Sequence, residues 1–200
     1  MLSEVLLSLK TGLNPRKNFK LNDTGANNYY VTVRELGGID IIFQEKTDMV
    51  TDDAIKLINN RSNLEKNDIL FSGTGTIGRT ALIQENPTNW NIKEGVYAIK
   101  PNPKKVLSKF LLFLFHSQKI IEQIDDKKVG SPVASIPMNE LKKIILPIPP
   151  LEEQERIVAI LDKFDSLVND ISEGLPAELN ARRQQYEYYR NKLLTFTEMN

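Results

Sequence analysis

The 200-residue sequence contains no cysteine and only one histidine, His116. The absence of thiols excludes disulfide scaffolds, thiol catalysis and cysteine-bound zinc, and a single imidazole leaves little room for a histidine-based metal site. Long apolar runs are also missing: the longest, Phe110 to Phe115, has six residues, whereas a membrane-spanning helix needs about 20. Residues 1–4 contain no basic segment leading into an apolar one, so no secretory signal is predicted. We therefore expect a cytoplasmic protein with no membrane contact.

The charges are balanced overall but unevenly distributed. Residues 151–200 contain six Lys or Arg and ten Asp or Glu, a net charge of −4, which leaves +4 for residues 1–150 of a chain with zero net charge. A mildly basic body with an acidic tail is compatible with nucleic acid on the body and a protein partner on the tail.

Hydrophobic patterning predicts an α+β (mixed) fold, in which a globular domain is followed by a long, coiled-coil-type helical region. Helices are expected over residues 2–9 and 107–124, and strands over 28–33, 39–43, 69–71, 79–84 and 94–100. Leu146-Pro-Ile-Pro-Pro150 cannot be helix or central strand. The predicted boundaries are a globular domain over 1–146, a Pro-rich linker over 147–150 and helix over 151–196.

The tail carries an apolar stripe at heptad spacing. Its members are Ile157, Leu161, Phe164, Val168 and Ile171, continued by Leu179, Tyr186, Tyr189 and Leu193. Pro176 either kinks one helix or lies in the first turn of a second, and both remain open. The stripe needs a covering surface. Packing on the chain's own body is one solution, but the pattern favours a helical pair formed with another chain.

No pattern assembles a catalytic site or a metal site. Gly73, Gly75 and Gly78 match G-x-G-x-x-G, but the following residues 79–83 are typical of a strand and not of the helix that a dinucleotide site requires. A tight turn with exposed backbone N–H groups is predicted instead. The carboxylate pairs are typical of solvated faces, and His116 is interpreted as a packed or helix-capping side chain.

Two loops combine hydroxyls, backbone donors and cations, which are the groups that contact phosphates and base edges. They are 72–79 and 127–131, and an ordinary hairpin with an ordinary basic loop is the alternative. Together with Arg34 and Arg61 outside them, these loops supply the candidate nucleic-acid contacts: Ser72, Thr74, Thr76, Arg79, Lys127, Lys128 and Ser131.

Four segments resemble the DNA-specificity (S) subunits of type I restriction–modification enzymes. Leu146-Pro-Ile-Pro-Pro-Leu-Glu-Glu-Gln-Glu-Arg-Ile-Val158, continuing to Phe164, is similar to the junction of linker and helix in that family. Residues 174–178 and 182–194 look like the distal part of the same helical region. Residues 68–79 resemble the glycine turn of the family's target-recognition domain.

The resemblance implies a non-catalytic subunit that reads one half of a bipartite double-stranded DNA site and docks methyltransferase (M) subunits. It implies no cofactor in this chain, since S-adenosylmethionine binds the M subunits, and a restriction motor-nuclease (R) subunit as a further partner. Family members commonly hold two recognition domains and two helical regions. A single set implies a half-length form, natural or truncated, that pairs as an antiparallel homodimer on a symmetric site. Other hypotheses are an interaction-only decoy that occupies the M subunit, and a nucleotide-dependent enzyme built on the glycine turn.

Overall fold

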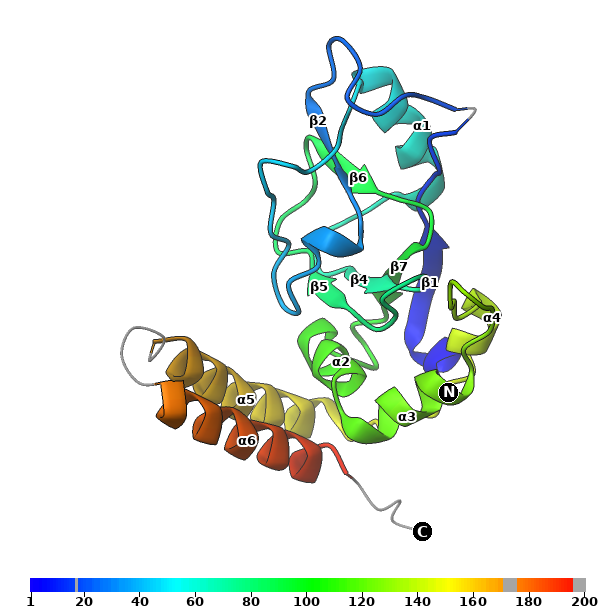
Figure 1. The fold of residues 1–200 in the computed structure, drawn as a ribbon. Helices are drawn as coiled ribbons and strands as arrows, with labels where there is room; N and C mark the ends of the chain where they lie inside the picture. Colours follow the sequence, from blue (N-terminus) through cyan, green and yellow to red (C-terminus); the bar gives the residue numbers. More distant parts are fainter. Residues whose placement is uncertain (17, 171–175, 196–200) are drawn as a thin grey trace.

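The computed structural model describes residues 1–16, 18–170 and 176–195, and it contains two small sheets, the helices that cover them, and a protruding pair of helices (Figure 1). The first sheet has the order β1-β7-β4-β5 and is antiparallel throughout. Its strands are β1 (Leu6–Thr11), β4 (Ile69–Ser72), β5 (Thr80–Leu82) and β7 (Val96–Pro101). The predicted helix over 2–9 was wrong: only η1 (Leu2–Val5) is helical, as a 3-10 turn, because the following residues pair with β7.

The second sheet has the order β3-β2-β6 and holds strands that are far apart in sequence. β2 (Asn28–Val31) pairs with β3 (Met49–Val50) in the antiparallel sense and with β6 (Trp90–Ile92) in the parallel sense. The strand expected over 39–43 is instead a loop that follows η2 (Val33–Glu35), with one isolated bridge between Leu36 and Ile41.

Helix α1 (Asp52–Ser62) covers the second sheet and was not predicted. The Thr51 hydroxyl accepts from the Ala54 N–H at 3.4 Å, which caps the first turn. Ala54, Ile55 and Ile58 form its buried face, in one cluster with Tyr30 and Val50.

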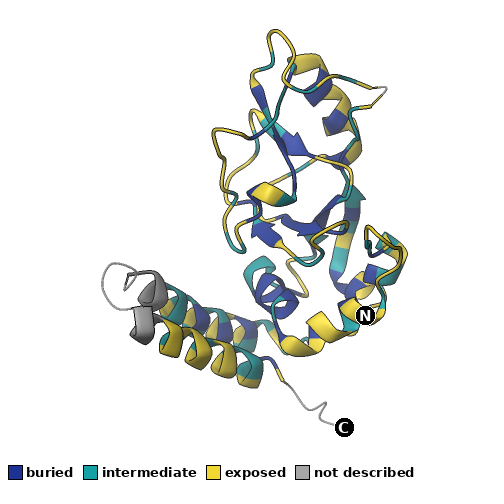
Figure 2. Ribbon diagram, in the orientation of Figure 1, coloured by how far each residue is buried: buried dark blue, intermediate teal, exposed yellow. Residues whose placement is uncertain are grey.

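The helix predicted over 107–124 is two helices, α2 (Ser108–Phe115) and α3 (Gln118–Asp126). α2 is buried on every side, with residues 110–115 at most 1% exposed, because the first sheet and the following helices enclose it (Figure 2). The chain turns at His116 and Ser117, where the Ser117 hydroxyl donates to the Leu114 carbonyl at 2.7 Å. Leu107, and not the hydroxyl-bearing Ser108, holds the N-cap position of α2; it caps without a side-chain hydrogen bond, and the Leu107 N–H donates to Gln154.

Two helices form the tail, which resolves the question that Pro176 left open. α4 (Met138–Leu141) precedes the Pro-rich segment, α5 (Leu151–Asp170) begins directly after it, and α6 (Pro176–Leu193) returns beside α5. Gln154 is fully buried and attaches α5 to the body: its Nε2 donates to the carbonyls of Lys105 and Pro149, and its Oε1 accepts from Leu107.

Part of the apolar stripe of the tail is covered by the chain itself, which is the alternative to a helical pair with another chain. Ile157 and Leu161 are 0% exposed in the same core as α2, and Leu193 packs against that core. The Phe164 ring stacks on Tyr189 at 5.7 Å between centroids and contacts Tyr186 at 6.5 Å. Ile171 and the side chains of Val168 and Leu179 lie outside the described part. α5 and α6 therefore form a helical pair within one chain, and pairing with a second chain stays a prediction.

Candidate nucleic-acid interface

The glycine turn connects β4 to β5 as strand, turn and strand, which confirms the predicted local structure. Gly78 has φ of +90°, which favours glycine. Ser72 is fully buried, and its hydroxyl donates to the Thr76 carbonyl and accepts the Arg79 N–H. Ser72 thus shapes the turn from inside, whereas Thr74 and Thr76 are exposed. Because the turn leads into β5, the helix that would hold a dinucleotide at this point is absent.

Residues 134–136, which follow the second candidate loop, lie against this turn, although Gly75 and Ala134 are 59 positions apart in sequence. The Gly75 N–H donates to the Ala134 carbonyl at 2.9 Å, and the Ile136 N–H donates to the Gly73 carbonyl at 2.9 Å. An isolated bridge joins Thr74 to Ser135. The hydroxyls of Thr74, Thr76 and Ser131 therefore belong to one composite loop surface, formed by residues 73–79 and 129–135.

The two lysines beside this surface each have a carboxylate nearby. Lys127 lies 4.0 Å from Glu140, and Lys128 forms an ion pair with Asp125. Their side chains are about one-third exposed, so DNA would have to compete with these carboxylates for them.

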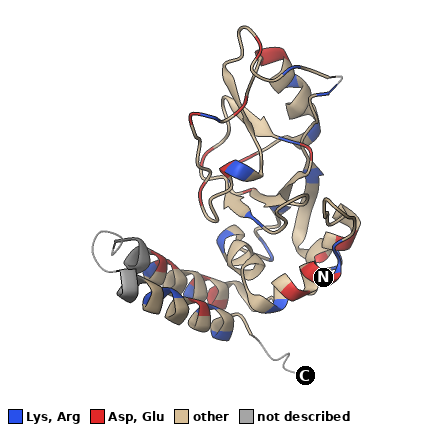
Figure 3. Cartoon of the chain, viewed as in Figure 1, with Lys and Arg blue, Asp and Glu red and all other residues tan. Residues whose placement is uncertain are grey.

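Two arginines border a hollow of about 460 Å³ on the other side of the turn. The hollow is lined by Arg34 from η2, Arg79 from the turn, Gln44 from the loop after η2, and the backbone of residues 37–38. Arg79 Nη1 donates to the Val33 carbonyl at 3.5 Å, so its guanidinium lies beside η2. Figure 3 shows Lys and Arg interspersed with Asp and Glu over the body of the chain.

Arg61 does not join this group. It lies in the last turn of α1, 3.9 Å from Glu94, and is not among the residues that line the hollow. In Figure 1, α1 and the loop after η2 lie on opposite sides of β2 and β6. Of the predicted cations, the structure therefore brings Arg34 and Arg79 together and places Arg61 elsewhere.

His116 lies between this hollow and a second one of about 400 Å³ that Lys128 and Arg190 line. Its Nε2 is 2.6 Å from the Thr80 hydroxyl, which donates to the Gly38 carbonyl at 2.7 Å. A hydroxyl has one proton, so Nε2 must be the donor to Thr80. Burial, aided by the charge of Arg190, lowers the pKa of His116 to about 4, and the ring is neutral at pH 7. It is a packing residue that connects α2 to the sheet, as the sequence predicted.

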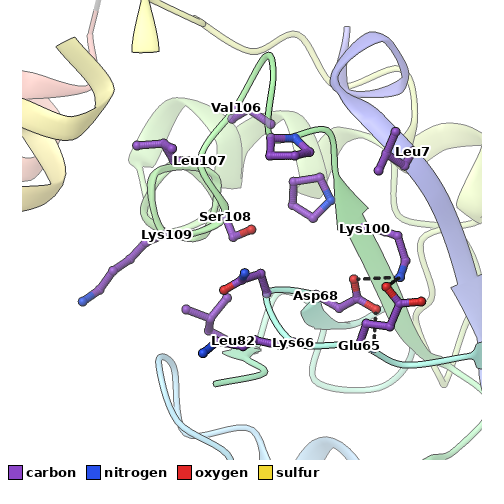
Figure 4. Close-up of a pocket in the computed structure, with 13 residues that line it drawn as sticks. Leu7, Glu65, Lys66, Asp68, Leu82, Lys100, Val106, Leu107, Ser108 and Lys109 are labelled. Carbon is purple, nitrogen blue, oxygen red and sulfur yellow. Dashed lines mark hydrogen bonds and ion pairs between the residues drawn. The ribbon is translucent and has the colours of Figure 1, made fainter. Parts of the chain in front are cut away.

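A hollow of about 510 Å³ lies between β7 and the start of α2 and contains an ion-paired cluster (Figure 4). Lys100 Nζ is 2.8 Å from Glu65 and 3.6 Å from Asp68. Burial raises the pKa of Asp68, while its oxygen accepts the Glu65 N–H at 3.0 Å. One ammonium thus holds two carboxylates, and the cluster fastens the 65–68 turn to β7. Among the described residues, no group of three or more metal-ligating side chains occurs.

A family model for the type I restriction modification DNA specificity domain matches residues 2–181. The chain belongs to this family. The resemblance inferred from the sequence is confirmed.

Relatives in the specificity family cover part of the chain at substantial identity. A putative type I restriction enzyme specificity subunit from Haemophilus influenzae is 39% identical over 133 residues, which are 66% of this chain and 33% of that protein. A type I restriction enzyme specificity subunit from Escherichia coli is 41% identical over 105 residues, 52% of this chain and 26% of that protein. The chain therefore matches only about a third or less of the length of these relatives.

Solved structures support the fold. A chain from a structure of the type I R-M system has a TM-score of 0.64 at 20% identity, with 96% of this chain and 44% of that chain covered. The HsdS subunit from Thermoanaerobacter tengcongensis has a TM-score of 0.57 at 22% identity, with 92% and 44% covered. The predicted mixture of helices and sheets is confirmed. In the described residues, no helix is long and apolar enough to cross a membrane.

Sequence reasoning missed several residues at the arginine hollow of this specificity-family chain. Thr32, Glu35 and Asp48 surround Arg34, and Gln44 lines the hollow. The sequence Thr32-Val-Arg-Glu35 does carry a signal, since Thr followed by Glu three residues later is a capping box, and the structure contains it. Asp48 gave no such signal, because it comes near Arg34 only through the loop after η2.

Proposed function

We propose that the chain is a DNA sequence-specificity subunit of a type I restriction–modification system, which reads one half of a bipartite double-stranded site. The chain belongs to the specificity family, and one observation carries the proposal: the glycine turn, the 129–135 loop and two arginines lie side by side on its surface. The proposal assigns no reaction to this chain. S-adenosylmethionine is expected on the methyltransferase (M) subunits, and an R subunit completes restriction.

The proposed DNA face consists of the composite loop surface and the arginine hollow beside it. Exposed hydroxyls at Thr74, Thr76 and Ser131 supply uncharged hydrogen-bonding groups, and Arg34 and Arg79 supply the charge. These are the groups that protein–DNA contacts use most. Lys127 and Lys128 lie at the edge of this face, and their carboxylate partners weaken them as phosphate ligands. Arg61 is left out because it lies on α1.

The helical pair α5/α6 is the proposed partner surface. Figure 1 shows it projecting away from both sheets, and Figure 2 shows exposed residues along its outer side. Tyr188 is 60% exposed and Tyr189 38%, in contact at 5.3 Å between ring centroids. We propose that this outer side docks the M subunits and packs antiparallel on a second copy, which sets two recognition domains at a fixed separation. Tyr188→Asp is then expected to dissociate the dimer, so that light scattering gives the mass of a monomer, without changing the melting temperature of the chain.

Fluorescence anisotropy of the chain assembled with its M subunits tests the DNA face. We expect the logarithm of the binding constant to fall linearly with the logarithm of salt concentration, by about 0.9 per neutralised phosphate. The variant Thr74→Val/Arg79→Gln should weaken binding strongly. The control Thr24→Val/Arg61→Gln, which changes an exposed threonine and an arginine outside the face, should not.

Three other results would count against this assignment. If both double variants weaken DNA binding equally, the proposed DNA face is wrong. Assembly with the M subunits without any DNA binding would favour the interaction-only alternative. Retention of labelled nucleotide by the isolated chain would favour an enzyme built on the glycine turn.

A further inference from the structure

Arg34 is half-exposed, yet two side-chain hydrogen bonds hold its guanidinium in one orientation. Its Nε donates to the Thr32 hydroxyl at 3.2 Å, and its Nη2 donates to Asp48 Oδ2 at 2.6 Å. Thr32 is itself fixed, since its hydroxyl and its N–H donate to Glu35 Oε2 at 2.8 and 2.7 Å. The long, flexible side chain thereby loses its rotational freedom before any ligand arrives.

A second layer of contacts fixes the two carboxylates. Asp48 Oδ1 accepts from the Asn22 side chain at 2.9 Å, and Asn22 in turn accepts the Met49 N–H at 2.8 Å. Glu35 is 1% exposed, and its other oxygen accepts the Thr47 hydroxyl at 3.1 Å. A buried carboxylate is costly unless its hydrogen bonds are satisfied, and here they are. The network around Arg34 is therefore rigid.

These contacts occupy one edge of the guanidinium and leave a second edge available for a ligand. The Nε–Nη2 edge is directed at Thr32 and Asp48, and no described residue bonds to Nη1. The remaining Nη1–Nη2 edge offers two parallel N–H donors. Two such donors match the O6 and N7 acceptors of guanine in the major groove.

The charges near Arg34 disfavour a phosphate. Asp48 lies 2.6 Å from Nη2, and Glu35 lies 3.9 Å from Nε, so two carboxylates surround one cation. A phosphate would be repelled by this net negative group, whereas the edge of a base carries no charge. Arg79 differs: in the described residues no carboxylate pairs with it, and its contact is a carbonyl at 3.5 Å. It is free to bind an anion.

We propose that Arg34 is a specificity-determining residue that donates two hydrogen bonds to a guanine of the target half-site, while Arg79 binds the neighbouring phosphate backbone. The inference rests on the proposed function and refines it, because it assigns the two arginines of one hollow to different chemistry. Asp48 is then a positioning residue, which keeps Arg34 in register and away from phosphates.

Binding of the chain in complex with its M subunits to modified duplexes tests the division of roles. Each guanine of the half-site is replaced in turn by 7-deazaguanine, which lacks the N7 acceptor. We expect one position at which this change weakens the wild type but has no effect on Arg34→Ala. The change removes one of two acceptors, so the wild-type loss should not exceed the roughly 5- to 150-fold of a bidentate contact. Arg34→Lys, which keeps the charge without the planar fork, should show a smaller effect than the wild type. Arg79→Ala should weaken all duplexes equally and reduce the salt slope by about 1.

The positioning role of Asp48 has its own test with a matched control. Asp48→Asn removes a charge beside Arg34 and should raise affinity for non-cognate DNA, so the specificity ratio falls. Asp53→Asn makes the same charge change at an exposed site on α1 and should leave the ratio unchanged. Because Asp48→Asn and Arg34→Lys preserve shape or charge, they remain informative if Arg34→Ala does not fold.

Two results would overturn the inference. If Arg34→Ala and Arg34→Lys retain the full 7-deazaguanine effect, another residue reads the base. If Arg34→Ala weakens all sequences equally and lowers the salt slope, Arg34 binds phosphate. Both leave the proposed function intact, whereas a wild-type complex with no sequence preference removes the proposed function and this inference together.

Discussion

Replacement of Ile157 by alanine tests whether the helical pair is part of the chain's own fold. Ile157 is 0% exposed in the core that contains α2. Large-to-small changes at such sites cost about 2–5 kcal/mol, from lost transfer free energy and the cavity left behind. For a chain of this size, we expect a loss of ~3 kcal/mol and a fall of roughly 6–12 °C in melting temperature.

Urea unfolding followed by far-ultraviolet circular dichroism and by the fluorescence of Trp90 gives the readout. Trp90 lies in β6 of the second sheet, so a shift there shows that the loss reaches the whole domain. Ile145→Ala is the matched control, since Ile145 is 62% exposed, and it should change stability by no more than about 0.5 kcal/mol. If Ile157→Ala lowers the mass of an oligomer and leaves the urea midpoint unchanged, the stripe faces another chain and our description of the tail is wrong.

Three further predictions follow from buried groups. Burial lowers the pKa of His116 to about 4 in the folded chain, so as pH falls the imidazole is protonated in the unfolded chain before it is protonated in the folded one. The free energy of unfolding should therefore drop by about 2 kcal/mol from pH 7 to pH 5. In His116→Gln, the urea midpoint should not show this contribution to the pH dependence. Gly73→Ala would place a Cβ 2.2 Å from the ring of Tyr97, whose hydroxyl is bonded to a buried carbonyl; we expect a loss of roughly 1–3 kcal/mol in urea unfolding, and an unchanged midpoint would contradict the packing. Gln154→Leu leaves the Leu107 N–H and two carbonyls without their partner. The free energy of unfolding should fall by more than about 2 kcal/mol. If α5 of the variant resists limited proteolysis as well as α5 of the wild type does, this prediction is refuted.

Local patterns in the sequence predicted the elements that depend on local chemistry. The strands at β2, β4, β5 and β7 and the glycine turn were found, because turn residues bound them. The start of α5 at Leu151 followed from the prolines before it. α1 was missed although Thr51, two aspartates and the spacing of Ala54, Ile55 and Ile58 carry a helix signal.

Contacts between distant segments account for the features that could not be predicted. The break between α2 and α3 coincides with the bond from His116 to Thr80, 36 residues away. A heptad stripe shows that a helix needs a partner, but it does not say which chain supplies it; here α6 and α2 do. The pairing of Lys127 with Glu140 also depends on how the 129–135 loop folds back.

Sequencing of DNA methylation in a host that carries this chain with its M subunits tests the central claim most directly. The account predicts methylation at one bipartite motif, which is lost when the chain is deleted and altered at a guanine position in the Arg34→Lys variant. If the host with the complete set of subunits carries no motif that depends on this chain, the chain does not specify a DNA sequence and the account is contradicted.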